Sequence, residues 1–143
     1  MHRLRFNQHL HANGMSASEL RNRLQTLHEE LKEIGQGDLD TSQLDPYCQE
    51  LIKPSFIRHK DKGVQALVAC NLADILRLYA PNAPFSQAEI KILFRFLLAQ
   101  LVSPSAGLAN ADHPLYKEAV YVLDSLSTVK SVVLICDLPS AGD

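Results

Sequence analysis

The residue types most able to do chemistry gather between positions 53 and 62. Four formal positive charges stand there against one carboxylate, which leaves a net charge of three within ten residues. The cluster consists of Lys53, Arg58, Lys60 and Lys62, with His59 and Asp61 between them. Such a basic loop can face DNA, an inositol polyphosphate or an acidic peptide, and the alternative is an ordinary solvated turn around a capping aspartate. Lys53, Arg58, Lys60 and Lys62 are therefore candidate polyanion or partner contacts.

The other reactive residue types do not form a recognisable catalytic or metal pattern. Of the six histidines, His9 and His11 are the close pair, and no cysteine joins them at a zinc spacing. The sequence has no glycine-rich phosphate loop, nucleophile elbow or HExxH helix. Three glutamates, at positions 29, 30 and 33, are expected on the solvated face of a helix. We predict no enzyme, no metal site and no cofactor.

Composition limits the class of protein. A chain of 143 residues with 46% hydrophobic residues is long enough for one globular domain with a core. Its net charge of -2 argues against a dedicated nucleic-acid binder, because phosphate neutralisation needs a concentrated basic surface. Cys48, Cys70 and Cys136 are far apart and odd in number, which favours free, buried thiols inside the cell. No apolar run reaches the roughly 18 to 20 residues that span a bilayer.

The elements that must position the basic cluster are helices, and the clearest of them follows it directly. Asp61 can cap free N–H groups at the start of this helix, and Pro81 and Pro84 end it. The small residues between the apolar positions allow neighbouring helices to approach on more than one side, so we expect a sandwiched helix. Its apolar positions follow the helical period: Val64, Leu67, Val68, Leu72, Ile75, Leu76 and Tyr79.

An earlier helix is predicted over residues 16–34, after an extended lead-in over residues 1–15. Its apolar residues are spaced four, three, four and three apart: Leu20, Leu24, Leu27, Leu31 and Ile34. We expect this leucine edge to dock on the rest of the domain, because two heptads are too few for a free-standing coiled coil. Gly35 and Gly37 stop the helix. A shorter helix around residues 44–52 ends before Pro54.

Two further helical segments follow the proline break. Ser86 and Glu89 have the spacing of a capping box. The stripe behind them consists of Ile90, Leu93, Phe94, Leu97, Leu98 and Leu101, and this helix should pack antiparallel to its predecessor. A loop over residues 103–113 leads to a stripe formed by Leu115, Ala119, Val122, Leu123 and Leu126. Residues 129–138 (VKSVVLICDL) are rich in β-branched residues, but they have no strand to pair with and are predicted to be helical.

These segments predict an all-α fold made of antiparallel helix pairs, with helix pairs over residues 43–143 and a single domain over residues 1–143. Leu115 lies 51 residues after Val64, somewhat more than the period of about 40 to 47 of a HEAT or armadillo repeat. The pattern of paired helices and short turns is that of an α-solenoid with HEAT-like repeats. A second hypothesis is an independent small helical adaptor or dimeriser that uses the seam over residues 20–34.

Four blocks of the sequence resemble the N-terminal region of the sister chromatid cohesion protein family, named for precocious dissociation of sisters. The most specific block is KDKGV followed by VAC-LADILRLYAP-AP, within residues 59–84. Gln65, where such repeats commonly carry arginine, and Asn71, where a cysteine or small residue is expected, depart mildly from the pattern. The other blocks are residues 4–10 (LRFNQHL), 20–31 (LRNRLQTLHEEL) and 127–138 (STVKSVVLICDL).

The resemblance implies a nuclear, non-catalytic HEAT-repeat scaffold that regulates sister chromatid cohesion in mitosis. Its implied partners are the cohesin kleisin subunit, the cohesin-release factor and the cohesin acetyltransferase, and a chromatin or inositol polyphosphate contact is a further expectation at the basic cluster. Members of the family are far longer. We therefore expect this chain to be a fragment or truncated product. Whether it carries the partner surfaces that the family has on later repeats, those for the kleisin included, is left open by the sequence.

Overall fold

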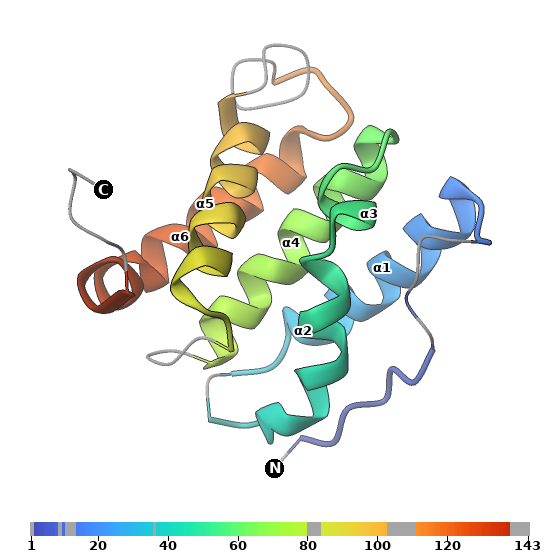
Figure 1. The fold of residues 1–143 in the computed structure, drawn as a ribbon. Coiled ribbons are helices and arrows are strands. Elements are labelled where there is room, and N and C mark those ends of the chain that lie inside the picture. Colours follow the sequence, from blue (N-terminus) through green and yellow to red (C-terminus); the bar gives the residue numbers. More distant parts are fainter. Residues whose placement is uncertain are drawn as a thin grey trace.

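The computed structural model describes residues 2–8, 10, 14–35, 37–79, 84–102 and 111–137, with side chains of the last helix described up to residue 126. This part of the chain is helical, as predicted, and holds one isolated parallel bridge between His2 and Leu39. The elements follow one another as shown in Figure 1: α1 (Ala17–Leu31), η1 (Thr41–Leu44), α2 (Asp45–Leu51), α3 (Pro54–Ile57), α4 (Lys62–Tyr79), α5 (Gln87–Val102) and α6 (Tyr116–Asp137).

Helix α4 is the centre of the fold. It contacts α1 on one side and α5 and α6 on the other, while α2 and α3 pack along it as well (Figure 1). Of its 18 residues, 13 are buried, including small residues such as Ala69 and Ala73 that lie between the large apolar ones. The predicted stripe is buried from Val64 to Leu76, and Tyr79 is partly buried. The prediction of a helix sandwiched between neighbours is confirmed.

The start of α4 is fixed by Asp61, as the sequence indicated. Its Oδ1 accepts a hydrogen bond from the N–H of Val64 at 2.9 Å, and its Oδ2 accepts one from Arg21 of α1 at 2.6 Å. The Val64 hydrogen bond, together with the Arg21 guanidinium, holds the pKa of Asp61 below its usual value. One carboxylate therefore caps α4 and ties it to α1. The helix ends at Tyr79, and Pro81 lies outside the described residues.

Helix α1 begins as predicted but ends earlier. Ser16 caps it by accepting a hydrogen bond from the N–H of Glu19. The helix ends at Leu31 and not at Ile34, because the Arg77 guanidinium of α4 takes up the carbonyls of Leu31 at 2.8 Å and Ile34 at 2.6 Å. These carbonyls at the end of α1 therefore accept hydrogen bonds from a side chain of another helix and not from N–H groups of a further turn of α1.

The leucine edge of α1 is buried against the rest of the chain. Its four leucines have no exposed surface and Ile34 is 4% exposed, so the edge serves packing within the chain as expected. After it the chain turns at Gly37, whose φ of 87° lies in the region that favours glycine. The α2 helix then buries Leu51, in agreement with the predicted shorter helix, and α3 buries Phe56.

The extended lead-in is held along α1 by a residue expected to be solvated. Glu30 accepts hydrogen bonds from the backbone N–H groups of Arg5 at 2.7 Å and Phe6 at 2.9 Å, and it lies 2.8 Å from the ring Nε2 of His2. The expectation of a solvated glutamate is wrong for Glu30, because unpaired N–H groups of the non-helical lead-in need an acceptor. Glu29 and Glu33 are exposed, as predicted.

Helix α5 begins with the predicted capping box. The N–H of Ser86 donates to Glu89 at 2.8 Å, and the N–H of Glu89 donates to the Ser86 hydroxyl at 3.1 Å. The expected stripe is wrong at Leu98, which is 53% exposed. At 100° per residue, Leu98 lies about 80° around the helix from Ile90, at the edge of the stripe. Phe96, on the opposite flank, is buried instead.

The two C-terminal helical predictions correspond to one continuous helix. Residues 129–137 form the second half of α6, and residue 138 lies outside the described part. Ala119, Val122 and Leu126 are buried, whereas Leu123 is 39% exposed and departs from the predicted stripe. Helices α4 and α5 run in roughly opposite directions, and α6 packs on both (Figure 1). No helix in the described ranges is both long and apolar enough to cross a membrane.

Candidate functional site

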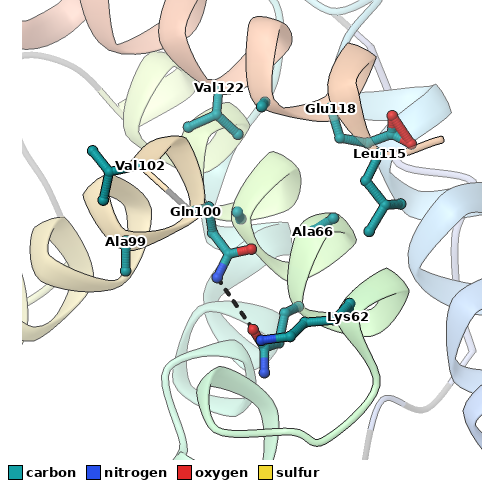
Figure 2. Close-up of a pocket in the computed structure, with 11 residues that line it drawn as sticks. Lys62, Ala66, Ala99, Gln100, Val102, Leu115, Glu118 and Val122 are labelled. Atoms are coloured by element: carbon teal, nitrogen blue, oxygen red, sulfur yellow. Dashed lines mark hydrogen bonds between the residues drawn. The ribbon is translucent and has the colours of Figure 1, made fainter. Parts of the chain in front are cut away.

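A cavity of about 340 Å³ lies between the first half of α4, the end of α5 and the first half of α6 (Figure 2). It exists because alanines stand where these helices face one another, so that the backbones approach while little side-chain volume fills the space. Larger apolar side chains form its walls. The lining consists of Ala66, Ala69, Ala99, Ala119, Val102, Val122 and Leu115, with the polar residues Lys62, Gln65, Gln100 and Glu118.

The polar groups stand at different parts of this cavity. The Gln100 amide donates a hydrogen bond to Gln65 at 3.3 Å, which joins α5 to α4 (Figure 2). Lys62 is exposed and makes no ion pair with a described residue. Glu118 has a buried carboxylate oxygen, Oε2, with no hydrogen-bond partner in the described part of the chain. The cavity therefore combines an apolar floor with one cation and one acceptor that lack partners.

The structure separates the residues of the predicted basic cluster. Lys53 pairs with Glu50 at 2.7 Å, so its charge is largely matched locally. Arg58 and Lys60 are exposed on the connection between α3 and α4, and Lys62 lines the cavity. Neither Arg58 nor Lys60 forms an ion pair with a described residue.

His59 and Asp61, the other polar residues of the connection between α3 and α4, form hydrogen bonds within the chain. The Nδ1 of His59 accepts a hydrogen bond from the N–H of Asp61 at 3.0 Å, and Asp61 itself is taken up by Arg21 and the α4 cap. The capping aspartate of the solvated-turn alternative is thus present. Of the cations in the cluster, Arg58, Lys60 and Lys62 form no ion pair with a described residue, and Lys62 lines the cavity.

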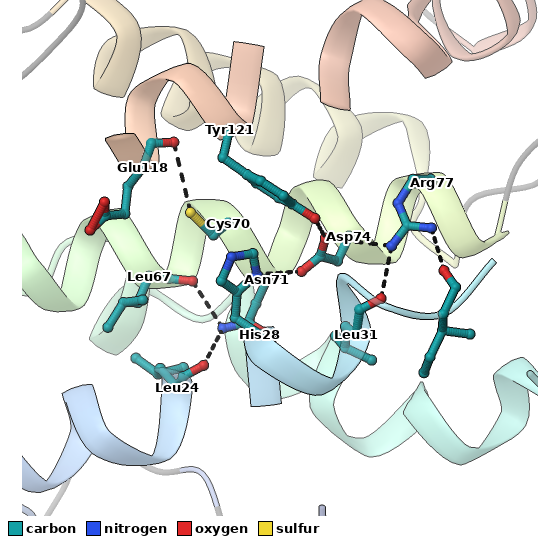
Figure 3. A network of polar contacts seen from close by, with 11 residues as sticks. Leu24, His28, Leu31, Leu67, Cys70, Asn71, Asp74, Arg77, Glu118 and Tyr121 are labelled. Atoms are coloured by element: carbon teal, nitrogen blue, oxygen red, sulfur yellow. Dashed lines mark hydrogen bonds and ion pairs between the residues drawn. The ribbon is translucent and has the colours of Figure 1, made fainter. Parts of the chain in front are cut away.

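A network of buried polar side chains lies at the centre of the molecule (Figure 3). The Asp74 carboxylate has no exposed surface, lies 2.6 Å from the Nδ1 of His28 and accepts a hydrogen bond from the Tyr121 hydroxyl. Arg77 stands 3.7 Å from the same carboxylate. Burial, with the neighbouring Asp74 charge, raises the pKa of Tyr121 well above its usual value, so the hydroxyl stays a donor at neutral pH.

Asn71 belongs to the same buried layer. Its amide N–H groups donate to the carbonyls of Leu24 at 3.0 Å and Leu67 at 2.9 Å (Figure 3). The network thereby joins α1, α4 and α6. Asp74 has no exposed surface, whereas His28 and Tyr121 also line a small pocket of about 150 Å³ between α1 and α6. The arrangement has the geometry of a structural tie between the three helices.

Sequence reasoning did not find His28, Asp74, Arg77 or Tyr121. The available signal was the presence of two polar residues, Asn71 and Asp74, within the apolar part of α4, where buried polar groups need hydrogen-bond partners. No cluster of three or more potential metal ligands occurs among the described residues, and His9 and His11 lie outside them.

The cysteines follow the prediction where they are described. Cys48 and Cys70 are free and buried. Burial raises the pKa of the Cys48 thiol to about 11 and raises that of Cys70 well above its usual value. The side chain of Cys136 is outside the described part.

Comparisons with known proteins agree on one family. The family model described as sister chromatid cohesion protein PDS5 matches residues 18–143. The chain is 37% identical over 129 residues to the sister chromatid cohesion protein PDS5 of Saccharomyces cerevisiae and 36% identical over 133 residues to that of Schizosaccharomyces pombe. These matches cover 90% and 93% of this chain but 10% and 11% of the two relatives. The chain thus spans about a tenth of their length.

A solved structure shares the fold. A chain in the structure of the Pds5–Scc1 complex superimposes with a TM-score of 0.84 at 36% sequence identity, over 96% of this chain and 21% of that one. The match places the helices described here in an all-α, HEAT-like solenoid, in agreement with the helix pairs expected from the sequence. Because the family model covers most of the chain and the fold agrees, the chain belongs to the PDS5 family of sister chromatid cohesion proteins.

Proposed function

We propose that this chain acts as a non-catalytic scaffold that regulates sister chromatid cohesion by binding cohesin. The observation that carries the proposal is the match over 96% of the chain, at a TM-score of 0.84, to a Pds5 chain in the structure of its complex with Scc1. The kleisin subunit of cohesin is accordingly the proposed partner. The cohesin-release factor and the cohesin acetyltransferase are further proposed partners, and the nucleus is the proposed place of action during mitosis.

The geometry supports a scaffold over an enzyme. Among the described residues, Asp74, His28 and Tyr121 bring acid, base and hydroxyl groups into contact, but the carboxylate at the centre of this constellation has no exposed surface. A catalytic group must reach its substrate, whereas a buried and mutually bonded group specifies packing. The surfaces between helices, in contrast, are of the kind that hold peptides of partner proteins.

The adaptor or dimeriser hypothesis needs the α1 seam to be available to a second copy. The seam is buried against the rest of the chain, with its four leucines unexposed. A second chain could bind it only by displacing α4, and the part-buried Arg21–Asp61 contact and the buried Asn71–Leu24 contact oppose that separation.

The basic cluster supports a second candidate function, a contact with chromatin or inositol polyphosphate. Arg58, Lys60 and Lys62 are exposed and form no ion pair with a described carboxylate, as a polyanion contact requires. Changing these three and Lys53 to glutamate should abolish binding to DNA and inositol phosphates. Unchanged binding in that variant would remove this candidate.

The scaffold proposal is tested in cells of the source organism. The gene that encodes the chain is deleted, and the distance between tagged sister loci is scored in cells arrested before anaphase. We expect premature separation of sisters, restored by the wild-type gene. Normal cohesion after deletion, in cells where no second family member is expressed, would contradict the proposal.

A further inference from the structure

We infer that the cavity between α4, α5 and α6 docks a short peptide of a partner protein, and that this peptide presents an aliphatic side chain next to a carboxylate. The inference rests on the scaffold function proposed above and names the peptide class that one surface of the scaffold accepts. It follows from the size of the cavity, its apolar floor and the exposed cations at its α4 end, which form no ion pair with a described residue.

The size and lining of the cavity suit aliphatic side chains. Its volume of about 340 Å³ lies near the lower end of the range of about 300 to 1,000 Å³ that ligand pockets occupy. Ala66, Ala69 and Ala119 are buried and leave a smooth floor, and Val122 and Leu115 supply wider apolar contact. One or two branched aliphatic side chains of a peptide fill such a space and remove its apolar surface from water.

The positive charge at the α4 end of the cavity favours an acidic residue in the bound peptide. Lys62 is exposed, lines the cavity and forms no ion pair with a described residue. Lys60 and Arg58 precede it on the same connection and are likewise exposed and unpaired. A carboxylate on the peptide, next to the inserted side chain, would lie close to these cations. An acidic peptide should therefore associate with the cavity faster than a neutral or basic one.

These features favour a peptide over a polyanion at the cavity itself. Binding of DNA or an inositol polyphosphate depends on several cations acting together. The cavity has one lining cation, Lys62, and one lining carboxylate, Glu118, whose charge repels a phosphate. More than half of its lining residues are apolar and gain nothing from contact with phosphate.

The test begins with an unbiased probe. A phage library of random peptides is selected on the full chain, and the enriched peptides are synthesised with a fluorophore and titrated by anisotropy. We expect the enriched set to share an aliphatic residue beside an aspartate or glutamate. Replacing that aliphatic residue by glycine, or the acid by lysine, should each weaken binding by about tenfold.

Variants of the chain then locate the site. Ala99→Phe, at an exposed lining position, fills the mouth of the cavity and should abolish binding, whereas Leu98→Phe makes a similar change at the exposed neighbouring residue outside the lining. Lys62→Glu should weaken binding by about tenfold and shift preference toward the lysine-containing peptide. Lys91→Glu makes the same charge change on α5 outside the lining and should leave affinity unaltered.

Several results would overturn the inference. The inference is wrong if the selection enriches no peptide, or if the enriched peptides lack the acid. It is also wrong if Ala99→Phe and the wild type bind the peptides with equal affinity. A further contrary result is that no peptide binds, while DNA or inositol hexakisphosphate binds and Lys62→Glu removes that binding. Co-precipitation of cohesin kleisin is measured with the same variants. If the wild-type chain binds cohesin but docks no peptide, this inference alone is refuted, and if the wild-type chain does not bind cohesin, the scaffold function is refuted.

Discussion

Replacing Asp74 by alanine tests how the three large helices are held together. Its carboxylate has no exposed surface and serves His28 of α1 and Tyr121 of α6 at once, while Arg77 stands 3.7 Å away. Removal leaves a buried histidine and a buried hydroxyl without their partner. Breaking a buried charged pair on one side costs about 3 to 5 kcal/mol.

The predicted loss of stability is large relative to the total free energy of unfolding. Domains of this size have a free energy of unfolding of about 5 to 15 kcal/mol, so Asp74→Ala should lose between about a fifth and all of it. Asp74→Asn keeps the shape and one acceptor oxygen, and we expect it to lose less, about 1.5 to 3 kcal/mol, the value of a charged hydrogen bond. Glu29→Ala removes an exposed carboxylate of α1 and should change stability by no more than about 0.5 kcal/mol.

The assay is urea unfolding followed by circular dichroism, with the slope of free energy against denaturant checked for each variant. A double-mutant cycle with Tyr121→Phe isolates the contact between the two helices, and we expect a coupling energy of about 1 to 3 kcal/mol. A loss below about 1 kcal/mol for Asp74→Ala, or no coupling to Tyr121, would refute the view that this network ties α6 to α4.

Three other predictions concern the core, the lead-in and the thiols. Leu72→Ala should lower the free energy of unfolding by about 2 to 5 kcal/mol, because Leu72 is fully buried, and an unmoved thermal transition would contradict this. Burial alone raises the pKa of Glu30, but the hydrogen bonds from Arg5, His2 and Phe6 outweigh it and bring the pKa below its ordinary value of 4.5. Glu30 therefore stabilises the fold above pH 4.5, and this contribution disappears as the pH falls through the lowered pKa. In Glu30→Gln, the free energy of unfolding should fall less steeply between about pH 6 and about pH 3 than in the wild type. An unchanged slope of this free energy against pH would argue against the lead-in contact. Cys48 and Cys70, with raised pKa values and buried sulfurs, should resist iodoacetamide at neutral pH in the folded chain and react after denaturation, as peptide mass spectrometry can show; rapid labelling of the folded chain would contradict their burial.

Local signals predicted most of the helices. Ser16, Asp61 and Ser86 cap helices where the sequence placed them, because a short polar side chain at a helix start acts on N–H groups a few residues away. The end of α1 could not be predicted this way. It depends on Arg77, which lies 43 residues after Ile34 and reaches its carbonyl only once α1 and α4 have packed.

The candidate site was predicted in part. The basic residues were recognisable from their spacing, but their separation into a locally paired Lys53 and a cavity-lining Lys62 depends on tertiary structure. The cavity is formed by three helices whose lining residues are small, and an alanine in a sequence does not indicate whether its neighbour fills the adjacent space. The Asp74–His28 contact joins residues 46 positions apart, which no local pattern indicates.

The central claim, that this chain is a cohesin-binding scaffold, is tested most directly by purifying it with cohesin. The gene product is tagged at its own locus, precipitated from chromatin treated with nuclease to remove DNA bridges, and its associated kleisin is quantified by mass spectrometry. The account predicts that kleisin is enriched over an untagged strain in amounts comparable to the chain itself. Kleisin at background level, with the tagged chain folded and present on chromatin, would contradict it.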